Sequence, residues 1–263
     1  MSATEPPADP TPPDGASVPP SDAFPAPVPP VAPPTGIPAP PPPPRTDAAD
    51  RVRIAWQRRA ESDYFFEFWT AVGWTILTCG LFAIYIVFQL VRRTRDHNLR
   101  RIEMLDAANS FAWEQAWARN CTEELRPEFE RTAAALAAMR AETSRFRDPV
   151  GWGVIAAFAG NIAAAAVFVL DDGDLIRHER AEYTAETALA AIYTRLGAQL
   201  AAPAPPTRAP HNYGARIAVS LVTCGLYLFW WQYDVMNEGN RHFAADWQFE
   251  DGLAAAVQHL LPA

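Results

Sequence analysis

The sequence contains no lysine, few cysteines and no excess of positive charge. All 22 of its basic residues are arginine, and 30 acidic residues give a formal net charge of −8. This acidic balance excludes a general nucleic-acid binder, because phosphate backbones attract positively charged surfaces. The planar fork of arginine suits phosphate head groups, but a GC-rich coding bias also produces a chain without lysine.

Cysteine is rare, and the common catalytic motifs are missing. The three cysteines, Cys79, Cys121 and Cys224, provide neither a disulfide framework nor the spacing of a zinc site. The sequence also lacks a phosphate-binding glycine loop, a zincin histidine pair and a serine nucleophile elbow. These absences predict a protein that is not an enzyme and that binds neither a cofactor nor a metal ion.

Proline is concentrated in the first part of the chain. Residues 1–44 contain 19 of the 26 prolines and no basic residue. Their few apolar side chains cannot offset the entropy of ordering, so we expect residues 1–45 to form a disordered tail with polyproline II character. We do not expect a signal peptide, because no basic segment precedes a short apolar one. The tail serves either as a docking site for a protein partner or as a flexible spacer.

Three apolar runs organise the remaining sequence. Residues 68–91 and 149–170 carry no charge, and residues 213–233 carry only Arg216. The first and third runs are copies, because Thr78-Cys79-Gly80-Leu81 returns as Thr223-Cys224-Gly225-Leu226 at an offset of 145 positions. The 24 residues of the first run would form a helix of about 36 Å, enough to cross a hydrocarbon core of about 30 Å. The pattern predicts an all-α integral membrane protein with three hydrophobic helices, of which the outer two form an internal repeat.

Charged and amphipathic segments separate the runs. We expect a charged helical lead-in over residues 46–67, a helical hairpin over 92–148, an amphipathic helix with a proline-rich linker over 171–212, and an acidic C-terminal helix over 234–263. Arginines follow the first run directly, so the positive-inside rule places the middle loop and the C-terminus of a multi-pass protein in the cytoplasm. The alternatives are a re-entrant run, or runs buried in a helical domain outside the membrane.

Small side chains line the second run. Ala156, Gly160 and Ala164 recur at four-residue spacing and let helices approach closely in a membrane. Asn161 lies beside them and needs a polar partner, which a neighbouring helix would supply. We expect this run to form the central helix, packed between the two repeats.

The repeated core offers one candidate binding site. Three residues of the first copy correspond to three of the second: Thr78, Gly80 and Tyr85 to Thr223, Gly225 and Trp230. Transporters built from repeats place paired sites at such an interface. Packing explains the same residues, because glycine permits close contact and threonine bonds to its own helix.

A second candidate lies just beyond each copy. His97 and His242 occupy equivalent positions, with Asn240 beside His242. Together they would form a polar cluster that binds a head group or a metal ion. Solvated or helix-capping histidines are the alternative, and the spacing matches no metal signature, so we assign no metal ligand.

Acidic residues form the one constellation typical of an enzyme. Asp171, Asp172 and Asp174 precede His178, Glu179 and Glu182. Such acids could hold Mg²⁺ against a lipid diphosphate. The start of a new helix explains them as well, because aspartate caps helices and acids in the first turn suit the helix dipole.

The repeated core resembles a known family. Thr223-Cys224-Gly225-Leu226-Tyr227, followed by Trp230-Trp231, is similar to the Thr-x-Gly-Ile-Tyr-x-x-Trp core of small bacterial membrane proteins grouped as domain of unknown function 4234. Asn240-Arg241-His242-Phe243 and Trp247 look like the segment that actinobacterial members carry after this core. The resemblance implies residence in the bacterial plasma membrane and no established activity.

We therefore expect a non-catalytic membrane scaffold or assembly protein. Its expected partners are the lipid bilayer, a protein bound through the proline-rich tail and a second copy of the chain, but not nucleic acid. The alternatives are a small transporter or channel subunit built from the repeats, and a lipid-modifying enzyme that uses the acids of residues 171–182.

Overall fold

Three long helices carry the fold, and each begins at a sharp turn. The computed structural model describes residues 46–261, all within Pro42–Ala263, one of the two units into which the chain divides. Every regular element of residues 46–261 is a helix, in the order α1 (Thr46–Gln57), α2 (Arg59–Ser62), α3 (Phe68–Leu77), α4 (Leu81–Ala118), α5 (Arg126–Thr143), α6 (Pro149–Ala159), α7 (Asn161–Arg195), α8 (Tyr213–Val222) and α9 (Leu226–Leu260). The predicted disorder of residues 1–45 lies outside the described residues.

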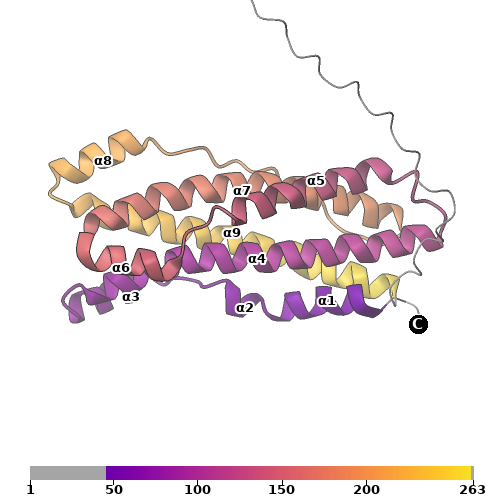
Figure 1. The fold of residues 1–263 in the computed structure, drawn as a ribbon, viewed down its shortest axis with the longest axis horizontal. Helices are drawn as coiled ribbons and strands as arrows, with labels where there is room; N and C mark the ends of the chain where they lie inside the picture. Colours follow the sequence, from indigo (N-terminus) through magenta and orange to yellow (C-terminus); the bar gives the residue numbers. More distant parts are fainter. Residues whose placement is uncertain (1–45, 262–263) are drawn as a thin grey trace, which may run out of the picture. The chain divides into compact units, whose positions relative to one another are not determined.

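Each long helix is the second arm of a hairpin. The short arms α3, α6 and α8 have 10, 11 and 10 residues, and the long arms α4, α7 and α9 have 38, 35 and 35 residues. The long arms run side by side in the same direction, and all three turns lie at one end of them, on the left in Figure 1. The term hairpin end denotes this part, residues 68–91, 149–170 and 213–233.

Glycine with positive φ makes each turn possible. Gly80 and Gly225 have φ values of 93° and 89°, and Gly160 has a φ value of 53°. Glycine reaches this region at little cost because it has no Cβ. In the first turn the hydroxyl of Thr78 donates to the carbonyl of Trp74 at 2.7 Å and accepts from the N–H of Phe82 at 2.9 Å. The hydroxyl of Thr223 makes the equivalent bonds in the third turn, at 2.8 and 3.1 Å.

These turns correct the prediction of membrane spans. Each of residues 68–91, 149–170 and 213–233 reverses direction at its turn, so each forms two helical arms instead of one continuous helix (Figure 1). Within residues 46–261, no helix combines the length and the apolar character that crossing a bilayer requires. The predicted integral membrane fold with three transmembrane helices is therefore wrong, and so is the multi-pass location in the plasma membrane.

The small-residue series of the second run is interrupted. Because α6 ends at Ala159 and α7 begins at Asn161, Gly160 lies in the turn, and Ala156 and Ala164 belong to separate helices. The buried face of α6 packs on α4. Asp171–Asp174 also do not break the chain, because α7 continues through them without interruption.

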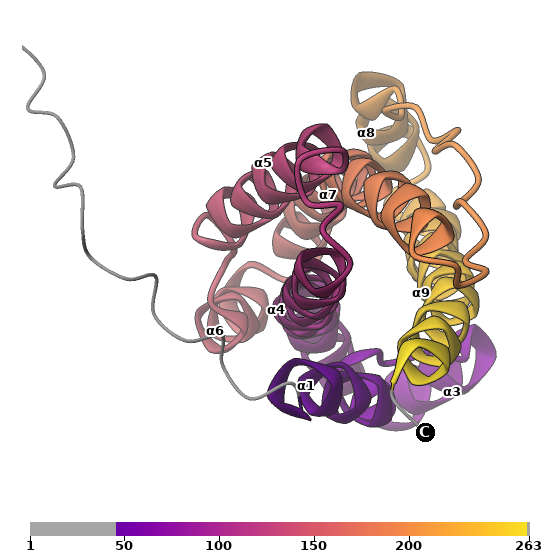
Figure 2. The same cartoon turned by 90° about the vertical axis from the view of Figure 1, so that its right-hand side faces the viewer.

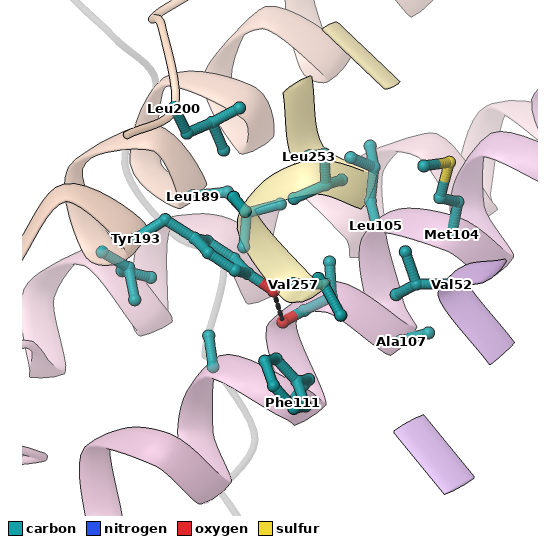
Figure 3. Packing of buried hydrophobic residues seen from close by; sticks show 14 of the residues in the cluster. Val52, Met104, Leu105, Ala107, Phe111, Leu189, Tyr193, Leu200, Leu253 and Val257 are labelled. Atoms are coloured by element: carbon teal, nitrogen blue, oxygen red, sulfur yellow. Dashed lines mark hydrogen bonds between the residues drawn. The ribbon is translucent and has the colours of Figure 1, made fainter. Parts of the chain in front are cut away.

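Two hydrophobic cores hold the helices together. The core nearer the hairpin end includes Leu90, Phe168 and Trp231. The second core joins α1, α5 and the distal halves of the long helices, and Figure 3 shows Tyr193 inside it, donating a hydrogen bond to the carbonyl of Ala108 at 3.0 Å. Figure 2 shows α1 against α4 and α9, and α5 against α7. Each fully buried large apolar side chain stabilises the fold by about 1.5–3 kcal/mol.

Candidate metal centre

A polar layer lies between the two hydrophobic cores. It consists of Asp63 and of buried charged side chains from the three long helices. Those from the helices are Arg93, His97, Arg100, Arg101, Asp171, Asp172, Asp174, His178, Glu182, Glu186, His242, Asp246 and Glu250. Charged side chains are rarely buried unless they pair with one another or bind a metal ion. The polar layer is therefore the part of the described chain where a functional site is expected.

Three histidines meet in this layer, one from each long helix. His97 and His242 follow Gly80 and Gly225 by 17 residues, and His178 follows Gly160 by 18. Because the three turns lie at one end of the long helices, this spacing brings the imidazoles to one level. The ring centroids of His97 and His178 are 5.4 Å apart, those of His97 and His242 5.2 Å, and those of His178 and His242 5.4 Å.

Glu182 adds a carboxylate one helical turn after His178. Its Oε2 lies 3.2 Å from Nε2 of His178 and 3.7 Å from Nε2 of His242. One ligand atom from each of His97, His178, Glu182 and His242 lies within 4.8 Å of the other three. The ligands of a tetrahedral Zn²⁺ ion lie about 2.0–2.2 Å from the metal and so roughly 3.5 Å from one another. Small side-chain movements would therefore enclose an ion.

Asp63 fixes the orientation of His97. Its Oδ1 lies 2.9 Å from Nδ1 of His97, so the opposite ring nitrogen, Nε2, faces the centre at 3.3 Å from Asp246. The other carboxylate oxygen of Asp63 accepts hydrogen bonds from Trp247 and Arg100, both at 2.7 Å. A carboxylate behind the outer nitrogen of a histidine is the arrangement that orients metal-binding imidazoles.

Several buried ring nitrogens have no hydrogen-bond partner among residues 46–261. They are Nε2 of His97, both ring nitrogens of His178 and Nε2 of His242. Carboxylate oxygens lie only 3.2 or 3.3 Å from the three Nε2 atoms, but not in hydrogen-bonding geometry. Buried polar atoms of native proteins are nearly always satisfied. A ring nitrogen of this set that carries no hydrogen therefore offers a lone pair to a metal ion.

The centre carries more negative than positive charge. Around the histidines, five carboxylates face two guanidinium groups: Asp63, Glu182, Glu186, Asp246 and Glu250 against Arg100 and Arg101. Arg101 contacts three of these acids, among them Glu250 at 3.0 Å. A buried excess of negative charge is unfavourable and is relieved by bound protons or by a cation. A divalent ion would displace such protons and take their place.

The pKa values of the centre shift in opposite directions. Burial alone would lower the pKa of His97, but Asp63 and Asp246 raise it to about 9. Burial raises the pKa of Glu186 well above its usual range, although Arg101 opposes the shift. Burial lowers the pKa of His242 well below its usual range, against the attraction of Glu182. His242 is therefore neutral, the form of imidazole that binds metals, whereas His97 carries a proton near neutral pH that a metal ion must displace.

A cavity of about 620 Å³ borders the centre. Its buried lining includes Glu182, Glu186, His242 and Asp246, and the segment after α7 together with part of α9 forms the remaining wall. The cavity thus connects two of the four possible metal ligands to the surface of the described chain.

The structure brings together two of the predicted binding residues. His97 and His242 both lie in the centre. Asn240 lies nearby, but its side chain bonds to the backbone N–H and carbonyl of Phe66, at 3.0 and 2.7 Å, and so positions the segment before α3.

The repeated core does not form a shared site. Thr78 and Gly80 belong to one hairpin turn, and Thr223 and Gly225 belong to another. Tyr85 and Trp230 are exposed side chains of the hairpin end. The packing explanation, in which threonine bonds to its own helix, matches these contacts.

The acids after the second run have separate partners. Asp171 accepts a hydrogen bond from Thr94 and Asp172 accepts one from Tyr213, both at 2.6 Å, while Asp174 pairs with Arg147 and Arg177. All three aspartates lie inside α7 and cap no helix. Their contacts join α7 to neighbouring segments, and of the constellation it is Glu182 and His178 that form part of the centre.

Sequence reasoning missed Asp63 and Asp246, which lie beside the histidines, and misread His178. His178 was grouped with the acids, although it lies almost as far beyond Gly160 as the other two histidines lie beyond their turn glycines. That spacing is the signal that could have identified it. Asp63 carries no comparable signal, because it lies 34 positions before His97 in an irregular segment.

Comparison with family models, with curated proteins and with solved structures gives no match for this chain. The resemblance to the family grouped as domain of unknown function 4234 therefore rests on the motif residues alone.

Proposed function

We propose that this chain is a non-catalytic metal-binding protein in which His97, His178, Glu182 and His242 hold one divalent transition-metal ion. The observation that carries the proposal is the convergence of four buried ligand groups, from three helices, to within 4.8 Å. Imidazole nitrogen and carboxylate oxygen are ligands that Zn²⁺ and neighbouring metals accept. The unpartnered ring nitrogens and the excess of carboxylates both support a cation at this place.

The number of ligands supports a structural role for the ion. A tetrahedral site with four protein ligands has no open position for a reacting water, whereas catalytic zinc sites keep one. An ion held from α4, α7 and α9 would cross-link the three hairpins, as metal ions do in the cores of other helix bundles. We infer a scaffold whose long helices are fastened together by the ion.

Metal titration of the full chain tests this proposal. After treatment with a chelator, the protein is titrated with Zn²⁺ in a calorimeter and with Co²⁺ in a spectrophotometer. We expect one ion per chain and the intense visible absorption of tetrahedral Co²⁺. At a free Zn²⁺ concentration 100 times Kd, the ion should raise the free energy of unfolding by about 2.7 kcal/mol, which thermal melting detects.

Two histidine variants distinguish Zn²⁺ binding at the centre from Zn²⁺ binding at any other histidine. His178→Ala removes a ligand and should weaken Zn²⁺ binding by roughly 100-fold or more. His259→Ala changes an exposed histidine in the last turn of α9 and should leave the affinity unchanged. Glu182→Gln gives a second test that preserves side-chain shape. Equal affinities in all of these variants, or the weak spectrum of octahedral Co²⁺, would contradict the proposed centre.

A further inference from the structure

The hairpin end exposes large apolar side chains at the tips of all three hairpins. Leu77, Phe158 and Val222, which lie next to the turns, are 71%, 90% and 84% exposed. Further exposed apolar residues surround them: Trp69, Trp74, Ile76, Leu81, Val150, Val154, Ile155, Ile162, Leu221, Leu226, Phe229 and Trp230. An exposed apolar surface of this size is typical of an interaction site.

We propose that the hairpin end enters one leaflet of a lipid bilayer, with the turns deepest and the long helices leading out into water. Three lines of observation support a leaflet: the length of the arms, the hydrogen bonds of the turns and the order of side chains along the arms. The proposal is independent of the metal centre, because it uses different residues at a different level of the long helices.

The depth of the apolar zone matches one leaflet. Short arms of 10 or 11 residues are about 15 Å long, half of a hydrocarbon core of about 30 Å. Charged residues flank the first two hairpins without entering them: Glu67 and Arg92 border the first, and Asp148 and Asp171 border the second. The third hairpin contains one charged residue, Arg216 in the first turn of α8, and it pairs with Asp234 at 2.9 Å. A protein partner would impose no such common depth on three hairpins.

The turns satisfy their own backbone groups, as hydrocarbon requires. An unpaired backbone N–H or C=O is strongly unfavourable in lipid. The N–H of Gly80 donates to the carbonyl of Thr75, and the N–H of Gly225 donates to the carbonyl of Ser220, both at 2.7 Å. The N–H of Gly160 donates to the carbonyl of Ala156 at 2.9 Å. Protein–protein interfaces usually include direct hydrogen bonds, and these turns use their own groups internally.

The order of side chains along the arms also fits a leaflet. Leucine, valine and phenylalanine occupy the tips, whereas Trp69 lies two residues after Glu67, and Tyr233 lies next to Asp234. Tryptophan and tyrosine prefer the boundary between hydrocarbon and water because their rings have one polar edge. Trp69 and Tyr233 would therefore lie at the height of the head groups, whereas Trp74 and Trp230 would lie deeper.

Flotation of the full chain with vesicles of phosphatidylcholine and phosphatidylglycerol tests the proposal. The unchanged chain should float with the vesicles. The triple variant Leu77→Glu, Phe158→Glu, Val222→Glu places a charge at each tip and should reduce the bound fraction by at least about ten-fold. The control variant Ile54→Glu, Leu99→Glu, Trp117→Glu adds the same charge at other exposed apolar residues and should float like the unchanged chain. Equal flotation of both variants, or no flotation of the unchanged chain, would overturn the proposal.

The native cysteines measure the depth of insertion. Cys79 and Cys224 are exposed residues of two turns, whereas Cys121 lies in the loop after α4. In single-cysteine variants, an environment-sensitive dye on either turn cysteine should shift to shorter wavelength when vesicles are added, and a dye on Cys121 should not. A second copy of the chain is the competing occupant. If the turn cysteines become protected by dimerisation in the absence of vesicles, and vesicles add no shift, the lipid proposal is wrong.

Discussion

The polar layer and the hairpin end have opposite distributions of polar and apolar groups. The polar layer buries charged side chains and pairs them with one another, so that its polar groups face inward. The hairpin end satisfies its backbone groups within each turn and exposes apolar side chains. A folded protein usually buries apolar side chains and exposes charged ones. Both regions do the opposite, and they do so on all three hairpins. Departures of this kind are expected at functional sites, because stability alone does not favour them.

The largest expected effect is the loss of stability when an ion pair of the polar layer is removed. Its size shows whether these pairs are shielded from water. Arg101→Ala leaves Glu182, Glu186 and Glu250 without their shared partner and should lower the free energy of unfolding by about 3–5 kcal/mol. Arg58→Ala removes an exposed pair with Glu61 and should cost less than about 1 kcal/mol. Urea denaturation measures both. Similar losses for the two variants would mean that water reaches the layer.

A smaller effect on the free energy of unfolding is expected from a glycine-to-alanine substitution. The comparison is between Gly239, which lies against Arg93 of the polar layer, and Gly73 of the hairpin end. A Cβ at Gly239 would lie 2.3 Å from Nη2 of Arg93, which donates to the carbonyl of Val235 at 3.0 Å. Gly239→Ala should therefore displace Arg93 and cost about 1–3 kcal/mol in the free energy of unfolding. At Gly73 in α3, no atom would lie within 4 Å of the new Cβ, so Gly73→Ala should leave stability equal or higher. A stable Gly239→Ala variant would show that Arg93 has room to move.

A third prediction concerns the carboxylate behind His97. Asp63→Asn keeps the shape of the side chain but removes its charge, and it should weaken Zn²⁺ binding by about 10–100-fold. Competition with a coloured chelator measures the affinity. Asp50→Asn changes an exposed carboxylate on α1 that pairs with Arg53, and it should have no effect. Unchanged affinity in Asp63→Asn would remove Asp63 from the metal centre.

The smallest effect is expected at a hairpin turn. Gly225 has φ of 89°, and a Cβ there would meet Asn161 only at an ordinary contact distance of 3.7 Å. Gly225→Ala should therefore show backbone strain alone, about 1–2 kcal/mol, as a small decrease in Tm. Gly214→Ala in α8, where φ is not positive, is the matched control and should melt like the unchanged chain. A decrease of the same size in both variants would contradict the strain explanation.

Hydropathy located the three hairpins but could not find their turns. Residues 68–91, 149–170 and 213–233 all belong to the hairpin end, and the described residues are all helical. However, glycine inside an apolar run is common in membrane spans and in turns alike. Positive φ values at Gly80, Gly160 and Gly225, and at Cys79 and Cys224 beside two of them, distinguish a reversal from a span, and hydropathy does not reveal them.

The internal repeat explains why part of the metal centre was predictable. Equivalent positions in two copies identified His97 and His242 as partners. The second run is not a copy, so nothing aligned His178 with them, although the structure places it at the same level. Asp63 and Asp246 reach the centre through tertiary packing, which hydrophobic periodicity does not describe.

The common distance between turn and histidine restricts changes in helix length. Inserting one residue between Gly80 and His97 would rotate the imidazole by about 100° around the axis of α4 and move it by about 1.5 Å, away from the other two rings. A one-residue insertion in this stretch should therefore separate His97 from His178 and His242, even if the added residue is small and polar. The stretch from Gly160 to His178 is one residue longer than the other two, so the packing of each helix sets its own permitted length.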